Sequence, residues 1–135
     1  MSKFKELIGK TLVKIELLPV NSASHYNEIV FTTTDGVMYK LLHEQSCCEI
    51  VFIESIVGDL SDIIGPSILV AEESTSEENP QGFVDSDEYS DEYIQVYFTW
   101  TFYKIATLKG YVDIRWYGSS NGYYSEGVTF KKMVN

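Results

Sequence analysis

Residues 93–108 read YIQVYFTWTFYKIATL, and this stretch decides the fold class. It is rich in aromatic and β-branched residues, which favour β-strands. In an extended chain Phe98, Trp100 and Phe102 share one face, whereas the residues between them share the other. Lys109-Gly110 then predicts a turn, after which the chain returns as a second strand. The stretch therefore predicts an antiparallel hairpin within a larger sheet.

The rest of the chain repeats this pattern of short strands separated by turn residues. Further strands are predicted at residues 13–17, 28–42 (as a hairpin), 48–57, 67–71, 111–118 and 123–133. We therefore predict a single domain over residues 1–135 of the mainly β (α+β) class, with an antiparallel, hairpin-rich sheet.

Two short helical pieces complete the prediction. The first is an N-terminal helix whose apolar residues Phe4, Leu7 and Ile8 are spaced three and four apart. The second is one helical turn near residues 59–64, which begins at an acidic residue, Asp59, that can cap it.

Turn residues also predict the register of the first hairpin. Asp35-Gly36 has the residue types of a two-residue turn, because both positions favour a positive φ. This turn places Val30 opposite Leu41 and Thr32 opposite Tyr39.

A final hairpin is predicted around Asn121-Gly122, with an odd number of residues in the loop. In this register Trp116 lies opposite Val128 and Ile114 lies opposite Phe130, so that apolar side chains share a face. The predicted core face carries Val112, Ile114, Trp116, Val128 and Phe130, and the opposite face carries Asp113, Arg115 and Tyr117.

The charge of the chain is concentrated in one segment. The 135 residues include 10 basic and 20 acidic side chains, for a formal net charge of −10. Nine of the acidic side chains lie within residues 72–92, which contain no lysine or arginine. We predict that this stretch is a flexible acidic loop, because it offers few apolar side chains to a core. Direct binding of duplex nucleic acid, which needs clustered basic side chains, is not expected.

The sequence predicts a cytoplasmic protein that has no membrane partner. No apolar run approaches the roughly 18 residues that a transmembrane helix needs. Residues 1–20 lack the unbroken apolar stretch of a signal peptide, because Lys10, Lys14 and Glu16 interrupt it.

Sequence motifs of enzymes and cofactor sites are scarce. There is no phosphate-binding loop, no nucleophile elbow and no zinc-like cysteine pair. An extended chain would place four polar side chains on one side, His43, Gln45, Cys47 and Glu49, which allows a thiolate–imidazole pair or a metal site. Strand residues four positions apart nevertheless lie roughly 13 Å from each other. We therefore expect a protein that is not an enzyme and that uses no metal or cofactor.

Candidate binding residues gather around the predicted final hairpin. Arg115 is the only arginine of the chain, and a guanidinium group can bind phosphate through two hydrogen bonds. Aromatic rings near it can stack on a base. The candidate ligand-binding residues are Arg115, Tyr117, Asn121, Tyr123, Tyr124 and, on a neighbouring strand, Lys104. This set predicts a pocket for a nucleotide-type small molecule.

Four stretches also carry a resemblance to a known family. They are HEQSCCE at 43–49, VGDL at 57–60, TWTFYK at 99–104 and RWYGSSNGYYS at 115–125. They resemble an uncharacterised family of small domains in tailed bacteriophages and prophages, and the similarity runs over about residues 7–130. The resemblance implies a protein that counters a host defence system, acting in the cytoplasm of the host cell.

Three functions remain open as hypotheses. The first is a non-enzymatic binding protein that sequesters a nucleotide-type signal. The second is an inhibitor of a host defence protein, such as a CRISPR effector, in which the acidic loop imitates nucleic acid. The third is a structural or assembly protein of the virion, joined to other subunits through exposed strand edges. Because several predicted strands are apolar on both faces, we also expect a homodimer.

Overall fold

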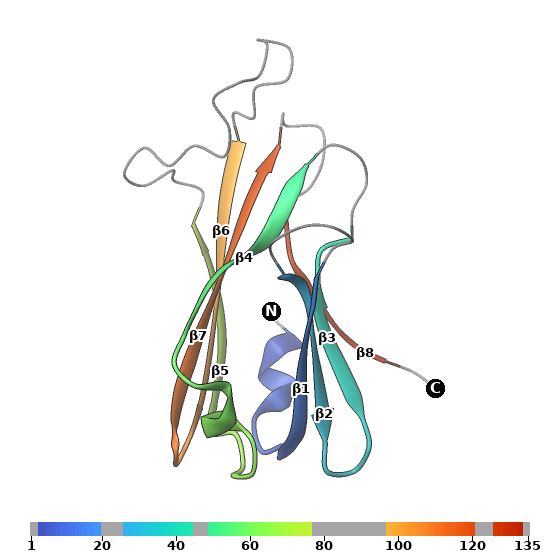
Figure 1. Ribbon diagram of the computed structural model, residues 1–135, viewed down its shortest axis with the longest axis vertical. Helices are drawn as coiled ribbons and strands as arrows, with labels where there is room; N and C mark the ends of the chain where they lie inside the picture. The colour runs from blue at the N-terminus through green and yellow to red at the C-terminus, as the bar shows by residue number, and fades with distance from the viewer. Residues whose placement is uncertain (1–2, 20–25, 45–48, 77–96, 121–125, 134–135) are drawn as a thin grey trace.

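The described part of the protein contains two antiparallel sheets of four strands each and two short 3-10 helices (Figure 1). The computed structural model describes residues 3–19, 26–44, 49–76, 97–120 and 126–133. The predicted mainly β class is therefore confirmed. None of the described helices is long and apolar enough to cross a membrane.

The two sheets draw their strands from different parts of the chain. The first has the order β1-β2-β3-β8 and consists of β1 (Leu12–Pro19), β2 (Tyr26–Thr33), β3 (Met38–Leu42) and β8 (Thr129–Lys132). The second has the order β4-β7-β6-β5 and consists of β4 (Ile50–Val57), β7 (Gly110–Ser120), β6 (Tyr97–Thr107) and β5 (Val70–Ser76). The 3-10 helices are η1 (Lys3–Leu7) and η2 (Leu60–Ile63).

The predicted hairpin forms the centre of the second sheet, but its turn is Leu108-Lys109 in place of Lys109-Gly110. β6 and β7 pair without interruption from Tyr97 opposite Ser120 to Thr107 opposite Gly110. These are the two longest described strands, at 11 residues each. The aromatic stretch thus specifies the main structural unit of this sheet.

A core between the sheets is closed on one side by η1. Its Phe4 ring contacts Tyr103 of β6, with ring centroids 4.7 Å apart, and Phe130 of β8, with ring centroids 5.2 Å apart. One aromatic side chain therefore contacts both sheets. Leu7 is buried beside it, but Ile8, predicted on the same helical face, is 47% exposed. A 3-10 helix has three residues per turn, so Phe4 and Leu7 share a face, whereas Ile8 lies on a different face.

The β2–β3 hairpin is present, but its predicted register is wrong by one residue. Thr33 N donates to Val37 O at 2.9 Å, so the loop has three residues and not two. Its last residue, Gly36, has a φ of 84°, as in three-residue loops that end on a left-handed glycine. The observed core-facing pairs are Ile29–Leu41 and Phe31–Tyr39, in place of Val30–Leu41 and Thr32–Tyr39.

The predicted final hairpin does not form, because β7 and β8 belong to different sheets. β7 lies between β4 and β6, so both of its edges are already paired. Phe130 of β8 lies opposite Leu41 of β3 and not opposite Ile114. The prediction of faces is nevertheless correct: Val112, Ile114, Trp116 and Phe130 are buried in the core, and Val128 packs against it. Alternation in a strand specifies which face is buried, but it does not specify which strand is the neighbour.

The first residues of the predicted acidic loop belong to a strand. β5 extends to Ser76, so Glu72 and Glu73 are strand residues paired with Lys104 and Tyr103 of β6. Pairing with a long strand overrides the weak strand preference of glutamate. The remainder of the acidic segment, residues 77–92, lies outside the described residues.

The predicted helical turn near residues 59–64 is confirmed as η2. Asp59 is its N-cap, and its carboxylate accepts hydrogen bonds from the Ser61 backbone N–H at 2.9 Å and the Ser61 hydroxyl at 2.8 Å. These bonds to the charged form lower the pKa of Asp59 below its ordinary value.

Candidate functional site

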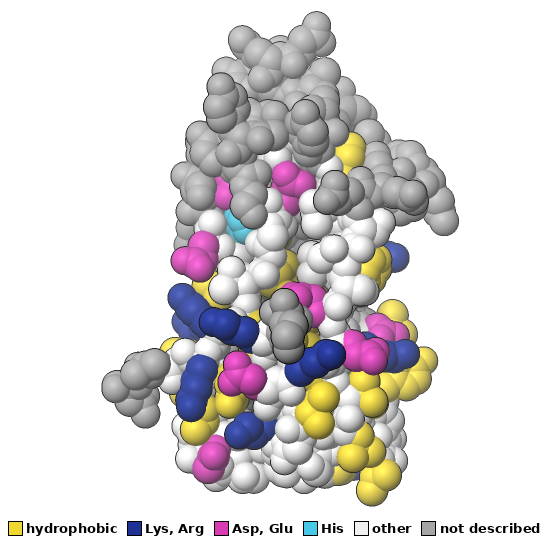
Figure 2. All heavy atoms as spheres, turned by 180° about the vertical axis from the view of Figure 1, so that it is seen from behind, with side chains coloured by type: hydrophobic (Ala, Val, Ile, Leu, Met, Phe, Trp, Pro, Cys, Tyr) yellow, Lys and Arg dark blue, Asp and Glu magenta, His cyan; other side chains and the backbone are white. Residues whose placement is uncertain are grey.

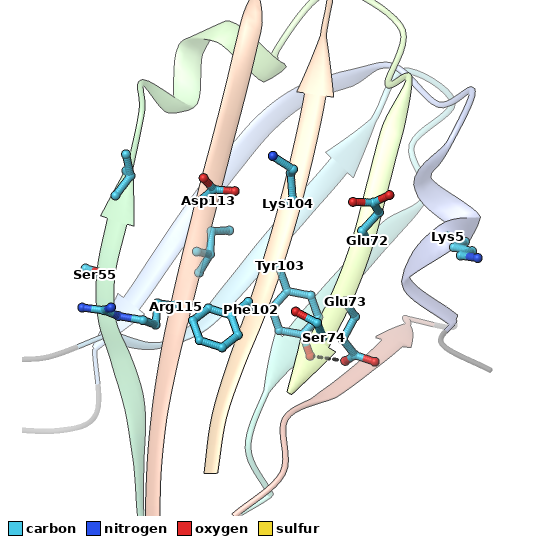
Figure 3. A pocket seen from close by; sticks show the side chains of 12 residues that line it. Lys5, Ser55, Glu72, Glu73, Ser74, Phe102, Tyr103, Lys104, Asp113 and Arg115 are labelled. Atoms are coloured by element: carbon cyan, nitrogen blue, oxygen red, sulfur yellow. Dashed lines mark hydrogen bonds between the residues drawn. The ribbon is translucent and has the colours of Figure 1, made fainter. Parts of the chain in front are cut away.

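A groove runs across the outer face of the second sheet (Figure 3). Its volume is about 700 Å³, within the range of pockets that hold small molecules. All four strands contribute side chains to it, and η1 contributes Lys5. The lining residues are Lys5, Ser55, Val57, Glu72, Glu73, Ser74, Phe102, Tyr103, Lys104, Asp113, Ile114 and Arg115.

Strand pairing arranges eight of these residues in two rows across the sheet. Residues that lie opposite each other in neighbouring strands share a face, and the next row lies two residues further along. The first row is Ser55–Arg115–Phe102–Ser74 and the second is Val57–Asp113–Lys104–Glu72. The groove thus presents an arginine, a lysine, an aromatic ring and two carboxylates on one surface.

Arg115 is held in a defined orientation at the edge of this groove. Its Nε donates to Glu54 Oε1 at 2.6 Å, and its Nη2 lies 2.5 Å from the same oxygen. Its guanidinium carbon lies 5.1 Å from the centre of the Trp100 ring, within the range of a cation–π contact. The side chain is still 46% exposed, and its Nη1 makes no hydrogen bond to another described residue, so it can donate to a ligand.

Glu54 reaches Arg115 because of an irregularity in β4. The register of β4 against β7 shifts between Ile53 and Ser55, so Glu54 is an extra residue without an opposite partner in β7. The bulge directs its carboxylate toward Arg115. Sequence reasoning did not identify Glu54, because a bulge of this kind leaves no clear signal in the sequence.

Lys104 and Phe102 provide the second cation and the exposed ring of the groove. The Lys104 ammonium lies 5.3 Å from the centre of the Tyr111 ring, and its neighbours in the row are Glu72 and Asp113. The Phe102 side chain is 37% exposed. Phe102 was not among the predicted site residues, although alternation along β6 places it on the same face as Lys104.

Tyr103 closes the groove from the core side. Its hydroxyl donates to Glu73 Oε2 at 2.5 Å. Burial, together with the nearby Glu73 carboxylate, raises the pKa of Tyr103 far above its ordinary value, so the hydroxyl stays protonated. It acts as a hydrogen-bond donor that holds Glu73 in position.

The structure brings together two of the six predicted site residues. Arg115 and Lys104 both line the groove. Tyr117 lies on the same face of β7 but one row away, where it is fully buried among Phe52, Phe98 and Trp100. Because a buried ring cannot stack on a ligand, this position contributes packing. The other predicted residues, Asn121, Tyr123 and Tyr124, lie outside the described residues.

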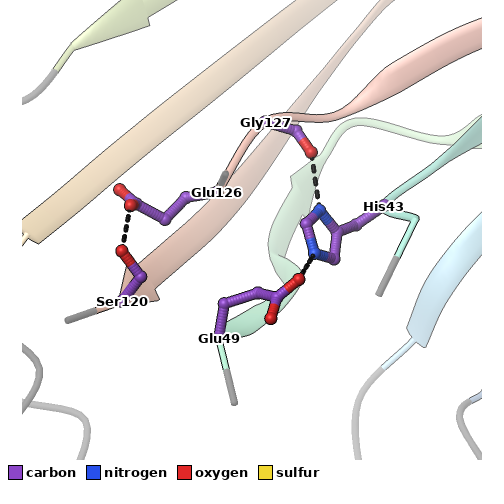
Figure 4. Close-up of polar contacts among 5 residues, drawn as sticks. All are labelled: His43, Glu49, Ser120, Glu126 and Gly127. Carbon is purple, nitrogen blue, oxygen red and sulfur yellow. Dashed lines mark hydrogen bonds and ion pairs between the residues drawn. The ribbon is translucent and has the colours of Figure 1, made fainter. Parts of the chain in front are cut away.

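A second polar cluster joins the two sheets at one end (Figure 4). His43, which follows β3, and Glu49, which precedes β4, have side chains that are 4% and 0% exposed. His43 Nδ1 lies 2.7 Å from the carbonyl oxygen of Gly127, and Nε2 lies 2.7 Å from Glu49 Oε2. A carbonyl oxygen only accepts hydrogen bonds, so Nδ1 carries a proton.

This second cluster has the geometry of a structural link. Both ring nitrogens of His43 are occupied, so neither is available as a base or a metal ligand. No group of three or more metal-binding side chains occurs in the part of the chain that the structure describes. The other two residues of the predicted constellation, Gln45 and Cys47, lie outside that part.

Charges of both signs are mixed on the described surface. Figure 2 shows basic and acidic side chains side by side across the middle of the molecule, with hydrophobic side chains gathered toward one end. The groove has the same mixed character, with Lys5, Lys104 and Arg115 near Glu72 and Asp113. It therefore suits a ligand that carries both anionic groups and hydrogen-bond donors.

Comparisons with known proteins identify a family. No curated protein and no solved structure matches the chain. A family model described as a domain of unknown function, DUF7448, matches residues 5–130. The match covers most of the chain, which therefore belongs to the DUF7448 family.

Proposed function

We propose that this chain is a non-enzymatic binding protein that captures a nucleotide-type small molecule in the groove of its second sheet. The observation that carries the proposal is the orientation of Arg115. Glu54 and Trp100 hold its guanidinium group at the edge of the groove, next to the exposed ring of Phe102. A binding group that is held in place before the ligand arrives loses less entropy on binding.

Each part of a nucleotide finds a chemically suitable partner in the groove. The free N–H groups of Arg115 and the ammonium of Lys104 can bind phosphate oxygens. The Phe102 ring offers a face on which a base can stack. The carboxylates of Asp113 and Glu72 can accept hydrogen bonds from ribose hydroxyls or from an amino group of the base.

Capture of a signalling nucleotide would account for the biological role that the phage resemblance implies. A protein that holds such a signal in the host cytoplasm lowers its free concentration and needs no catalytic group. On this proposal the activity depends on affinity and on the amount of protein.

A binding experiment with defined probes tests the proposal. Purified protein is titrated in a calorimeter with mononucleotides, linear dinucleotides and cyclic dinucleotides. Arg115→Ala and Phe102→Ala are the test variants. Lys132→Ala, which removes an exposed cation from the first sheet, is the matched control. We expect at least one probe to bind the parent and the control, and to bind both groove variants at least about tenfold more weakly.

Two results would contradict the proposal. One is that no nucleotide binds the folded protein. The other is that binding persists unchanged in Arg115→Ala and Phe102→Ala, which would place the ligand elsewhere. Nucleotide binding that is lost only on deletion of residues 77–92 would favour the acidic segment and not the groove.

A further inference from the structure

One edge of the first sheet is open. β1 is the outermost strand of the order β1-β2-β3-β8, and no described strand pairs with its outer side between Lys14 and Leu18. Among the described residues, only the beginning of β1 is covered, where Gly65 N donates to Leu12 O at 3.0 Å. An uncovered strand edge presents unpaired backbone groups to another chain.

The backbone groups of Ile15 point toward this open edge. Thr33 N donates to Val37 O, so the odd-numbered residues of β2 bond to β3 and its even-numbered residues bond to β1. Lys14 and Glu16 lie opposite even-numbered residues and are therefore bonded to β2. Ile15 lies between them and turns its N–H and C=O groups outward.

Apolar side chains accompany this open backbone. Val13 is 52% exposed and Leu18 is 38% exposed. Ile15 and Leu17 pack against the core but are only partly buried. Single exposed apolar residues are common on protein surfaces, but four on one free edge strand form a surface suited to pairing.

We propose that a second copy of this chain pairs with β1 in the antiparallel direction, around a two-fold axis at Ile15. In this arrangement Lys14 lies opposite Glu16 of the partner subunit, and Glu16 lies opposite Lys14 of the partner subunit. Each Ile15 exchanges two backbone hydrogen bonds with its symmetry mate. The interface closes on itself, so it produces a dimer and not a polymer.

The charges of β1 favour this register over axes at the two adjacent residues. In an antiparallel pair, two residues that lie opposite each other direct their backbone N–H and C=O groups either both toward the other strand or both away from it. Consecutive residues of a strand direct these groups to opposite sides. The two-fold axis must therefore pass through a residue and not between two residues. An axis at Lys14 would place two lysines opposite each other, and an axis at Glu16 would place two glutamates opposite each other. Like charges in these positions are destabilising. An axis at Ile15 gives two opposite-charge pairs.

Lys14 and Glu16 form an exposed ion pair with each other, which they can exchange for the pairs across the axis. Within one chain their charged groups lie 3.7 Å apart, and their side chains are 62% and 40% exposed. Such an exposed pair contributes little to the stability of the fold. Charge reversals at either position therefore leave the monomer folded.

Charge reversal gives a test with an internal control. The mass in solution is measured by sedimentation equilibrium over a range of concentrations for the full chain, K14E, E16K, the double variant K14E/E16K, and an equimolar mixture of the two single variants. We expect the parent chain to dimerise, and each single variant to dimerise about tenfold or more weakly. The double variant and the mixture should both recover the dimer, because both restore opposite charges across the axis.

Each departure from this pattern overturns the proposal. A parent chain that stays monomeric shows that the edge does not pair. If K14E and E16K dimerise as tightly as the parent chain, the dimer interface lies at another surface. If the single variants dimerise weakly but the double variant does not recover the dimer, this register is excluded. The nucleotide groove lies on the other sheet, so none of these results bears on the proposed function.

Discussion

Arg115 and Trp116 are neighbours in β7 whose side chains point to opposite faces, and their replacement by alanine separates function from folding. Arg115 lines the groove on the outer face, and Trp116 is 1% exposed in the core. We expect Arg115→Ala to abolish tight ligand binding with little loss of stability. Trp116→Ala should do the reverse.

The contacts of each side chain give the expected magnitudes. Arg115 forms an ion pair with Glu54, and because both side chains are partly exposed this pair contributes about 0–1 kcal/mol. Its cation–π contact with Trp100 contributes about 0.5–1 kcal/mol. The stability cost of Arg115→Ala is therefore at most about 2 kcal/mol. A lost charge-assisted contact to a ligand costs about 2 kcal/mol, which weakens binding by about 30-fold. Trp116→Ala empties a large buried site at a cost of about 3–5 kcal/mol.

Thermal melts and calorimetric titrations measure both effects on the same samples. A loss of 1 kcal/mol lowers the Tm of a domain of this size by about 3–5 °C, so Trp116→Ala should melt about 10 °C or more below the parent. Trp116→Phe is the milder control. The buried Nε1 of Trp116 has no hydrogen-bond partner among the described residues, so its removal offsets part of the lost packing.

Two results would contradict this role of Arg115: Arg115→Ala unfolds the protein, or it leaves nucleotide binding unchanged. The first result would make Arg115 a structural residue that links β7 to the β4 bulge through Glu54. The second would show that the groove does not hold the ligand.

Two further predictions concern the links that hold the fold together. Glu49→Ala removes the partner of His43 Nε2 and leaves this buried ring nitrogen unpaired, so we expect the free energy of unfolding in denaturant to fall by about 3–5 kcal/mol. A fall below about 1 kcal/mol would show that the pair is not a structural link. Asp59→Ala should lower the Tm at neutral pH but not in acid. The folded pKa of Asp59 is depressed, so its stabilising effect is present above the ordinary carboxyl pKa and is lost as pH falls through the lowered value. Equal Tm losses at neutral and acid pH would contradict this role.

Local residue patterns predicted most of the elements and most of the buried faces. The aromatic stretch at 93–108 predicts β6, and Asp59 predicts the cap of η2. The registers were harder to predict, because a three-residue loop that ends on Gly36 and a two-residue Asp35-Gly36 turn use the same residue types. A difference of one residue in the loop moves every pair of the hairpin.

The candidate site was predicted only in part, because it depends on contacts between strands that are distant in the sequence. Arg115 and Lys104 could be assigned to it from their types and their places in neighbouring strands. Glu54 could not, because it requires both the pairing of β4 with β7 and a bulge in that pairing. Tyr117 was assigned to a ligand, but the three aromatic rings around it belong to strands that flank β7 on both sides.

The separation of β7 from β8 shows why the partner of a strand cannot be read from its own residues. Glu126, the first described residue after β7, lies against Gly118 of β7. A Cβ atom at Gly118 would lie 2.8 Å from the carbonyl oxygen of Glu126, so only glycine allows this approach without a shift of backbone. The Glu126 carboxylate accepts hydrogen bonds from Thr99, at 2.8 Å, and from Ser120, and these bonds tie the segment that precedes β8 to β6 and β7. These contacts with the second sheet fix where the chain lies before it enters the first sheet, and no pattern within β7 alone predicts them.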